Sequence, residues 1–175
     1  TENDKRFEKN GAQLYSDTEY IWQKAGKLST RPVVAGFGPA GMFAALALAR
    51  AGMRPLVLER GQDVDTRIRD VESFFAGGAL NTESNVQFGE GGAGTFSDGK
   101  LNTGIKDSRC REILKVFVSH GAPEKILTDA KPHIGTDILS GVVKSIRNEI
   151  ITLGGEVRFG TRLDKINRKN GGIYS

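Results

Sequence analysis

The sequence predicts an α/β fold in which helices flank a parallel sheet. Two short apolar segments, residues 31–35 and 54–59, have the composition of buried strands, and an apolar helix pattern lies between them. A glycine-rich turn joins the first strand to that helix. Strands that alternate with helices are typical of a parallel sheet, so these three observations set the fold class.

The first half of the chain predicts one βαβ unit, a second helix and a long loop. Residues 31–35, 39–51 and 54–59 form the strand, helix and strand of that unit. Residues 63–75 have the pattern of an amphipathic helix. Residues 77–104 follow as a glycine-rich stretch with little periodicity, and loops of that length are usually functional or disordered.

The second half predicts two more helices and then strands. Residues 107–120 have a helix pattern, and Thr136 is placed to cap a longer helix over residues 137–153. The apolar stripe of the longer helix comprises Ile138, Val142, Ile146 and Ile150. Residues 156–159 and 162–166 then have the composition of strands.

The composition favours one globular domain with close backbone contacts. Glycine accounts for 23 of the 175 residues, against a usual share of about 7%. The 38% hydrophobic and 26% charged residues argue against a disordered or coiled-coil chain. We expect a binding domain at residues 31–175, preceded by an arm at residues 1–30 with a short helix that Ser16 and Glu19 would cap.

Charge and cysteine content place weaker limits on partners and location. The net charge of +4 comes from basic residues interspersed with acidic ones, which indicates a mixed solvated surface rather than a nucleic-acid site. The single cysteine, Cys110, fits a reducing, cytoplasmic setting and a small buried side chain. The most apolar stretch, residues 33–49, is too short and too rich in glycine for a membrane span or signal peptide.

A GxGxxG pattern stands between the first predicted strand and its helix. Gly36 permits a tight turn, Gly38 allows the backbone to approach a pyrophosphate, and Gly41 allows the helix and strand to pack closely. Pro39 suits the first helical turn, where its missing N–H costs nothing. The positive end of the helix dipole favours a bound anion, so the pattern predicts a dinucleotide.

An acidic residue at the end of the second strand completes this pattern. Glu59 lies 18 residues after Gly41, where its carboxylate would accept hydrogen bonds from the two hydroxyl groups of a ribose. A 2′-phosphate would meet like charge there, although the neighbouring Arg60 weakens that argument. The alternative is a glycine-rich turn in an ordinary α/β protein with a surface glutamate.

Residues 85–102 form a second glycine-rich segment that could present many backbone N–H groups to an anion. Residues 94–100 have the GxxxxGK spacing of a phosphate-binding loop of nucleotide triphosphatases. However, Leu101 stands where a magnesium-binding serine or threonine is required, and Asp98 would repel phosphates. A triphosphatase is therefore disfavoured, and a flexible surface loop is the structural alternative.

Three motifs together resemble a known family. The turn GFGPAG, the strand end Glu59-Arg60-Gly61, and the stretch NVQFGEGGAGTFSDGKLNTGIKD followed by HIGTD resemble a bacterial family of FAD-dependent proteins, described as uncharacterised FAD-utilising dehydrogenases. The resemblance covers residues 31–163 and implies a Rossmann-like FAD/NAD(P)-binding fold similar to that of glutathione-reductase-like flavoproteins. It implies FAD as the cofactor, with the ribose on Glu59 beside Arg60. The pyrophosphate would lie on Gly36, Gly38, Pro39, Ala40 and Gly41.

The resemblance also implies contacts from two later segments. Arg162 and Leu163 would lie at the adenine, on a strand whose backbone pairs with the adenine edge. Lys100 would lie near the ribityl side of FAD. The residues along the pyrophosphate and ribityl side would be Gly91, Gly92, Ala93, Gly94, Thr95 and Ser97.

The family's fold usually contains a later strand ending in Gly-Asp that holds the ribityl chain, and this sequence has no such strand. We therefore expect an incomplete fold, a fragment of a longer flavoprotein. No catalytic residue is identified. His120 is expected to have a structural role at a helix end, and His133 to fix a loop. The sequence has no metal-ligand spacing.

The first functional hypothesis is a flavin-dependent oxidoreductase or dehydrogenase of unknown substrate. Its partners would be a small-molecule substrate and a reduced nicotinamide donor, with no nucleic acid and no membrane; the oligomeric state is open. The alternative is a non-catalytic FAD- or NAD-binding module with a structural or sensing role. The long second glycine segment argues against a simple NAD-binding unit.

Overall fold

The computed structural model describes residues 20–26, 28–105, 107–169 and 172–174. Its order of elements begins with β1 (Val33–Ala35), α2 (Pro39–Arg50), β2 (Leu56–Leu58) and α3 (Val64–Phe75). The long loop contains one short 3₁₀ helix, η1 (Gly92–Phe96). The remaining elements are α4 (Ser108–Ser119), η2 (Glu124–Leu127), α5 (Thr136–Thr152), β3 (Glu156–Arg158), β4 (Asn167–Lys169) and β5 (Gly172–Tyr174).

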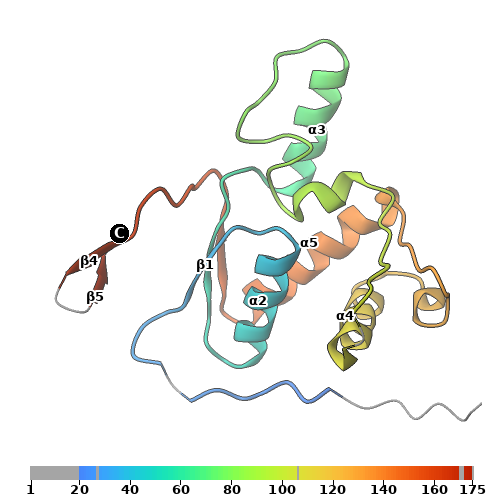
Figure 1. Ribbon diagram of the computed structural model, residues 1–175. Coiled ribbons are helices and arrows are strands. Elements are labelled where there is room, and N and C mark those ends of the chain that lie inside the picture. The colour runs from blue at the N-terminus through green and yellow to red at the C-terminus, as the bar shows by residue number, and fades with distance from the viewer. Residues whose placement is uncertain (1–19, 27, 106, 170–171, 175) are drawn as a thin grey trace, which may run out of the picture.

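A three-stranded parallel sheet in the order β1-β2-β3 organises the chain. Val34 pairs with Val57, and Val57 pairs with Val157. The helices α2 and α5 lie beside the sheet, α4 lies beyond them and α3 projects from the end of the molecule (Figure 1). The described chain therefore has the predicted α/β fold with a parallel sheet, and β4 and β5 form a separate antiparallel pair.

The hydrophobic core lies between the sheet and the helices on one face. Val57 of β2 is fully buried, as are Leu46 of α2 and Ile146 of α5. The opposite face of the sheet is open, since Val33 of β1 is 56% exposed. Buried strands in parallel sheets are usually covered on both faces, so the prediction of buried strands holds for one face only.

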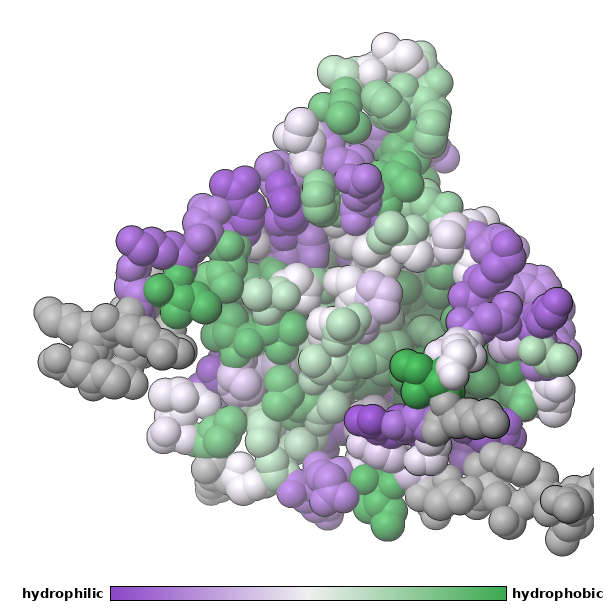
Figure 2. Space-filling view, in the orientation of Figure 1, coloured by the Kyte–Doolittle hydropathy of each residue, from purple (hydrophilic) through white to green (hydrophobic). Residues whose placement is uncertain are grey.

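Exposed hydrophobic side chains also gather where α3 ends. Phe74, Phe75 and Leu80 are 40%, 74% and 53% exposed. Figure 2 shows hydrophobic residues at the tip of this projection and over the centre of the face in view, with hydrophilic residues along its upper left and right margins. None of the helices among the described residues is long and apolar enough to cross a membrane.

Most helix boundaries agree with the predictions. Asp63 is the N-cap of α3 and accepts hydrogen bonds from the backbone of Asp65 and Thr66. His120 is the C-cap of α4, where its Nε2 lies 2.8 Å from Oε2 of Glu149, in keeping with the structural role expected of it. The four residues predicted to form the apolar stripe of α5 are partly or fully buried.

Four structural predictions were wrong. Thr136 does not cap α5; Gly135, with φ of +88°, occupies the N-cap without a side-chain hydrogen bond. Residues 162–166 form no strand, because hydrogen bonds from the nitrogens of Gly160 and Thr161 to the oxygens of Gly61 and Glu59 carry the chain across the end of β2.

The other two corrections concern the arm and the cysteine. Residues 20–26 are not helical, and the proposed capping pair Ser16 and Glu19 lies outside the described residues. Trp22 instead docks through a 2.7 Å hydrogen bond from its Nε1 to Oε1 of Glu112. Cys110 is only partly buried, because it lies at the open first turn of α4.

Candidate functional site

The first glycine turn joins β1 to α2 at the carboxyl end of the sheet. Gly36 has φ of +92°, a conformation that favours glycine. A Cβ on Gly41 would lie 2.0 Å from the carbonyl oxygen of Gly36, so the helix can follow the strand this closely only with glycine there. The predicted roles of these two glycines in the turn and in packing are therefore confirmed.

The beginning of α2 has the features of an anion site. Gly38 is the N-cap of α2, where no side chain accepts a hydrogen bond from the first helical turn. Pro39 occupies that first turn. The first-turn N–H groups of a helix lack intrahelical acceptors and lie at the positive end of its dipole. The backbone of Ala40 and Gly41 belongs to this turn. The turn thus fits a phosphate group.

Glu59 is 5% exposed and holds the glycine turn in place. Its Oε2 accepts a 2.6 Å hydrogen bond from the backbone nitrogen of Phe37, and its Oε1 accepts a 2.8 Å bond from the nitrogen of Gly61. Each carboxylate oxygen retains a second acceptor position. Sequence reasoning placed Glu59 at this edge but missed its bonds to the turn.

The second glycine segment lies directly against the first. The nitrogen of Gly91 donates a 2.8 Å hydrogen bond to the carbonyl oxygen of Phe37. Gly92 has φ of +64°, and a Cβ on it would come within 3.3 Å of the Cα of Gly38. The two segments, whose contacting residues are 54 positions apart in sequence, therefore form one continuous glycine-lined surface, which we call the glycine junction.

Three predicted side chains of the second segment already have hydrogen-bond or ion-pair partners within that segment. The hydroxyl of Thr95 is buried and donates to the oxygen of Glu90 over 3.1 Å. The hydroxyl of Ser97 donates to the oxygen of Gly94 over 2.8 Å. Lys100 is exposed and pairs with Asp98 at 2.8 Å. These side chains stabilise the loop, which leaves mainly its backbone to face a ligand.

A cavity of about 400 Å³ with a mixed polar and apolar lining opens beside the glycine junction, at the carboxyl ends of β1 and β2. Because Glu59, Arg60, Gln87 and Arg162 line it, we call it the polar cavity. Gln87, Phe88 and Thr161 also line it. The first two lie in the second glycine-rich segment but were not singled out as site residues, and Thr161 belongs to no motif. The predicted residues that line it are Gly36, Gly38, Glu59, Arg60, Gly92, Arg162 and Leu163. Residues from four separate parts of the chain therefore meet at one cavity.

An arginine pair lies at the rim of the polar cavity. Arg60 donates a 2.8 Å hydrogen bond from Nε to Oε2 of Glu83 and lies 4.1 Å from the centre of the Phe88 ring. NH1 of Arg162 lies 3.5 Å from Oε1 of the same glutamate. The hydrogen bond from Arg60 lowers the pKa of Glu83, which no sequence pattern had singled out.

A second cavity, of about 420 Å³, is largely apolar and begins at the other side of the junction, where Pro39 and Gly91 line it. The predicted residues Ala40, Gly94, Ser97 and Lys100 also line it. Its apolar walls come from α2, α4 and α5 and comprise Met42, Phe43, Ile113, Phe117, Leu139 and Val143. The glycine junction thus separates the polar cavity, whose lining is mixed, from a more strongly apolar one. The predicted residues Gly41, Ala93 and Thr95 line neither cavity.

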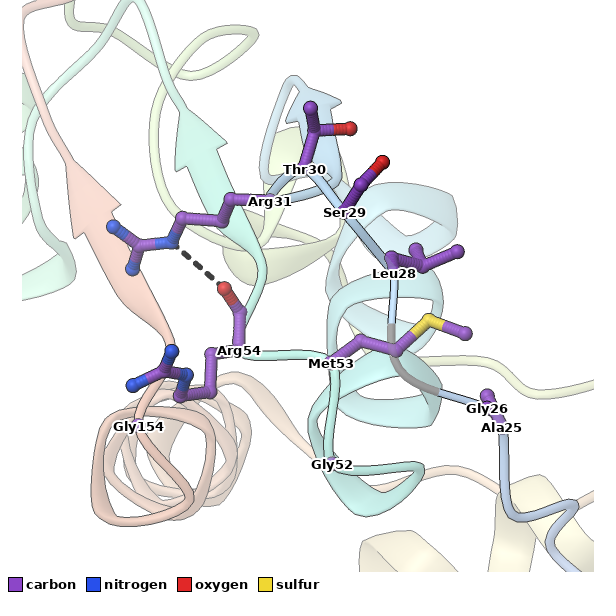
Figure 3. A pocket seen from close by; sticks show the side chains of 10 residues that line it. All are labelled: Ala25, Gly26, Leu28, Ser29, Thr30, Arg31, Gly52, Met53, Arg54 and Gly154. Carbon is purple, nitrogen blue, oxygen red and sulfur yellow. Dashed lines mark hydrogen bonds between the residues drawn. The ribbon is translucent and has the colours of Figure 1, made fainter.

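A larger cavity, of about 720 Å³, lies at the opposite end of the strands and is lined by Ala25, Gly26, residues 28–31, Gly52, Met53, Arg54 and Gly154 (Figure 3). Arg31 donates from Nε to the oxygen of Arg54 over 2.7 Å there. This cavity contains none of the predicted residues. Ligands of open parallel sheets bind at the carboxyl ends of the strands, so the two smaller cavities form the candidate site.

Acid–base and metal chemistry have few candidates in this site. The backbone of His133 forms an antiparallel bridge with that of Lys100, so the predicted loop histidine lies beside the second glycine segment. Among the described residues, no three His, Cys, Asp or Glu side chains are grouped to hold a metal ion.

Comparison with known proteins identifies a cofactor. Residues 31–100 match the family model described as FAD binding domain. The chain is also 57% identical over 159 residues to an uncharacterized protein of Clostridium beijerinckii, an alignment that covers 91% of this chain and 30% of that relative. The matched residues include both glycine segments, Glu59 and Arg60. The match supports an FAD-dependent family and indicates that this chain binds FAD.

Proposed function

We propose that this chain is the FAD-binding part of a flavin-dependent oxidoreductase or dehydrogenase whose substrate is a small molecule. The observation that carries this proposal is the glycine junction between a cavity of mixed lining, which Glu59, Arg60 and Arg162 supply with charge, and a cavity that is almost wholly apolar. FAD has a polar adenosine half and a flat, mostly apolar ring system on either side of its pyrophosphate. The polar cavity, the glycine junction and the apolar cavity follow one another in the same order as the adenosine, the pyrophosphate and the ring system of FAD.

The polar cavity would receive the adenosine. Glu59 would accept hydrogen bonds from the ribose, Arg60 would lie beside it, and Arg162 and Leu163 would lie at the adenine. The glycine junction would bind the pyrophosphate. It would do so through the backbone of Gly36, Gly38, Pro39, Ala40, Gly41, Gly91, Gly92, Ala93, Gly94 and Thr95.

The apolar cavity would exclude water from the ring system, with Ser97 and Lys100 at its edge. When bound, FAD supplies the hydride or electron transfer, and the protein supplies binding, orientation and electrostatics. A positive charge at Lys100 would favour negative charge on the ring. A reduced nicotinamide donor is the proposed source of electrons, in a reducing, cytoplasmic setting.

The chain spans 30% of the length of the Clostridium beijerinckii relative. We propose that residues 31–175 form the first part of an FAD-binding domain, that residues 1–30 precede it as an arm, and that further chain supplies the ribityl contact and most of the substrate site. The open face of the sheet at Val33 supports this proposal, because parallel sheets are normally covered on both faces.

A Gly38→Ala variant tests the proposal. Gly38 has φ of −71°, and a Cβ there meets no atom closer than 3.9 Å, so alanine fits the protein itself. It would project where the pyrophosphate binds. We expect FAD to bind the wild-type chain, and the variant to bind it at least about tenfold more weakly with an unchanged unfolding midpoint. Flavin fluorescence titration and thermal unfolding measure the two quantities.

The matched control is Gly141→Ala, on an exposed turn of α5 with nothing within 4 Å of the added Cβ, which should bind FAD as the wild type does. A wild-type chain that binds NAD and not FAD would overturn the proposal. Reduction of the bound flavin by NADH separates an oxidoreductase from a module in which FAD is only structural. A flavin that NADH and other donors leave oxidised would support the structural module.

A further inference from the structure

Arg67 is a fully buried arginine of α3 that holds one turn of the second glycine segment. Its Nε donates to the oxygen of Asn85, NH1 to that of Glu90 and NH2 to that of Val86, each over 2.7 Å. Its guanidinium carbon lies 4.7 Å from the centre of the Phe96 ring. One cation therefore gathers three carbonyl groups of a single turn, residues 85–90.

The turn is shaped to fit around this guanidinium. Gly89 has φ of +117°, and a Cβ on it would lie 2.6 Å from Cδ of Arg67. On its other side, a Cβ on Gly61 would lie 2.4 Å from the Cα of Gly89. Only glycine at both positions allows the turn to lie between the arginine and the end of β2.

The buried carboxylate of Glu90 fixes the same turn to two helices. Its Oε2 accepts a 2.8 Å hydrogen bond from the nitrogen of Val64, at the beginning of α3. Its Oε1 lies 3.3 Å from Nε of Arg147 of α5. The negative charges of Glu59 and Glu90 favour the charged form of Arg67, while burial lowers the pKa of Arg67 to about 10, so it stays protonated at neutral pH.

The turn leads directly into the glycine junction. Gln87, Phe88 and Gly89 line the polar cavity, and the next residues, Gly91 and Gly92, contact the first glycine turn. A change in the backbone of residues 85–90 would therefore move both the cavity wall and the junction. Arg67 itself lines neither cavity.

We propose that Arg67 is a positioning residue for the dinucleotide, whose guanidinium holds residues 85–92 in their binding conformation before the ligand arrives. This inference rests on the proposed function. A loop that is ordered in advance loses less conformational entropy when it binds. Arg67 acts through the backbone of the loop and does not contact the ligand.

An Arg67→Met variant, with Arg69→Met as its control, tests the inference. Arg69 is an exposed arginine of the same helix whose Nη2 donates to Oγ1 of Thr66 over 3.0 Å. We expect Arg67→Met to weaken FAD binding by about tenfold to hundredfold, as the loss of hydrogen bonds from a charged group predicts. Arg69→Met should bind FAD as the wild type does.

Hydrogen exchange followed by mass spectrometry supplies a readout that a general loss of stability would not reproduce. In Arg67→Met without FAD, the peptide covering residues 85–97 should lose protection while peptides from α5 keep it, and saturating FAD should restore it. Arg67→Lys keeps the charge but cannot reach three carbonyls, so it should show the same pattern more weakly. It replaces the methionine variant if that variant fails to fold.

Two results would overturn the inference. One is a folded Arg67 variant that binds FAD as tightly as the wild type with residues 85–97 still protected. The other is a wild-type chain, freed of FAD, in which the amide of Gly91 exchanges as fast as in an unfolded chain, although it donates to Phe37 here. A wild-type chain that binds no FAD would instead contradict the proposed function.

Discussion

Gly38 and Gly41 stand in the same turn but are needed for different reasons. Space for a Cβ exists at Gly38 in the protein alone, whereas a Cβ on Gly41 would lie 2.0 Å from the oxygen of Gly36. The requirement at Gly41 therefore comes from the packing of α2 against β1. Under the proposed function, the requirement at Gly38 comes instead from the pyrophosphate that would bind there.

A Gly41→Ala variant should consequently destabilise the protein whether or not FAD is present. We expect the free energy of unfolding to fall by about 3 kcal/mol, since the backbone of Gly36 must move to relieve the overlap. Urea unfolding measures this loss. Gly141→Ala is the control and should gain about 0.5–1 kcal/mol, because alanine favours a helix. A Gly41→Ala protein as stable as the wild type would show that the helix and strand are not this close.

Glu59 shows what the sequence can and cannot predict about a single residue. Its distance from the glycine turn was sufficient to place it at the site, because the spacing reflects one βαβ unit. Its hydrogen bonds to Phe37 and Gly61 were not predictable, since they depend on how the turn folds back over the end of β2. The same holds for Arg67, because an arginine in an amphipathic helix ordinarily indicates a surface position.

At the scale of elements, Glu90 joins the second glycine segment to α3 and α5. Burial raises the pKa of Glu90 above its ordinary value of 4.5, and the nearby charges of Asp63 and Asp65 act in the same direction. The hydrogen bond from Val64 and the charge of Arg147 act in the opposite direction. The folded protein therefore holds this proton more tightly than the unfolded chain does.

A Glu90→Gln variant should change how stability depends on pH. With the pKa raised in the folded state, ionisation of Glu90 reduces the free energy of unfolding as the pH rises above about 4.5. Glutamine does not titrate, so the stability of the wild type relative to the variant should fall between pH 4 and pH 8. Urea unfolding at several pH values measures the difference. A difference that rises with pH would mean that Arg147 outweighs burial.

Elements with strong local signals were predictable, and those set by tertiary contacts were not. Asp63 and His120 mark the ends of α3 and α4 through local chemistry that the sequence displays. Thr136 failed as a cap because Gly135, with its positive φ, precedes the helix instead. The prediction of a strand at residues 162–166 was wrong because backbone hydrogen bonds from Gly160 and Thr161 redirect the chain. No residue pattern predicts these bonds.

At the scale of the whole molecule, the described residues cover the sheet on one face only. The side chains of Val34, Val57 and Val157 pack into the core beneath the helices. Val33 points to the other face, where it is 56% exposed. An apolar residue this exposed in a parallel strand is unusual, and the relative is about three times as long as the aligned segment. By the proposed function, further chain such as the relative has is the expected cover.

A lysine on this open face distinguishes a covered sheet from an exposed one. In this chain, Val33→Lys should change the free energy of unfolding by no more than about 0.5 kcal/mol, because the side chain reaches solvent. At the residue aligned with Val33 in the Clostridium beijerinckii relative, lysine should cost about 2 kcal/mol or more, because a buried charge without a partner is expensive. Denaturant unfolding of both proteins measures the two values.

Lysine at Val57, which is fully buried on the helix-covered face, serves as the positive control and should destabilise both proteins strongly. If lysine at the Val33 position is tolerated equally in both proteins, the added chain of the relative does not cover this face. The open sheet would then be a feature of the fold itself, and the further chain of the relative would have to dock elsewhere, with the apolar surface at Phe74 and Phe75 as the next place to test.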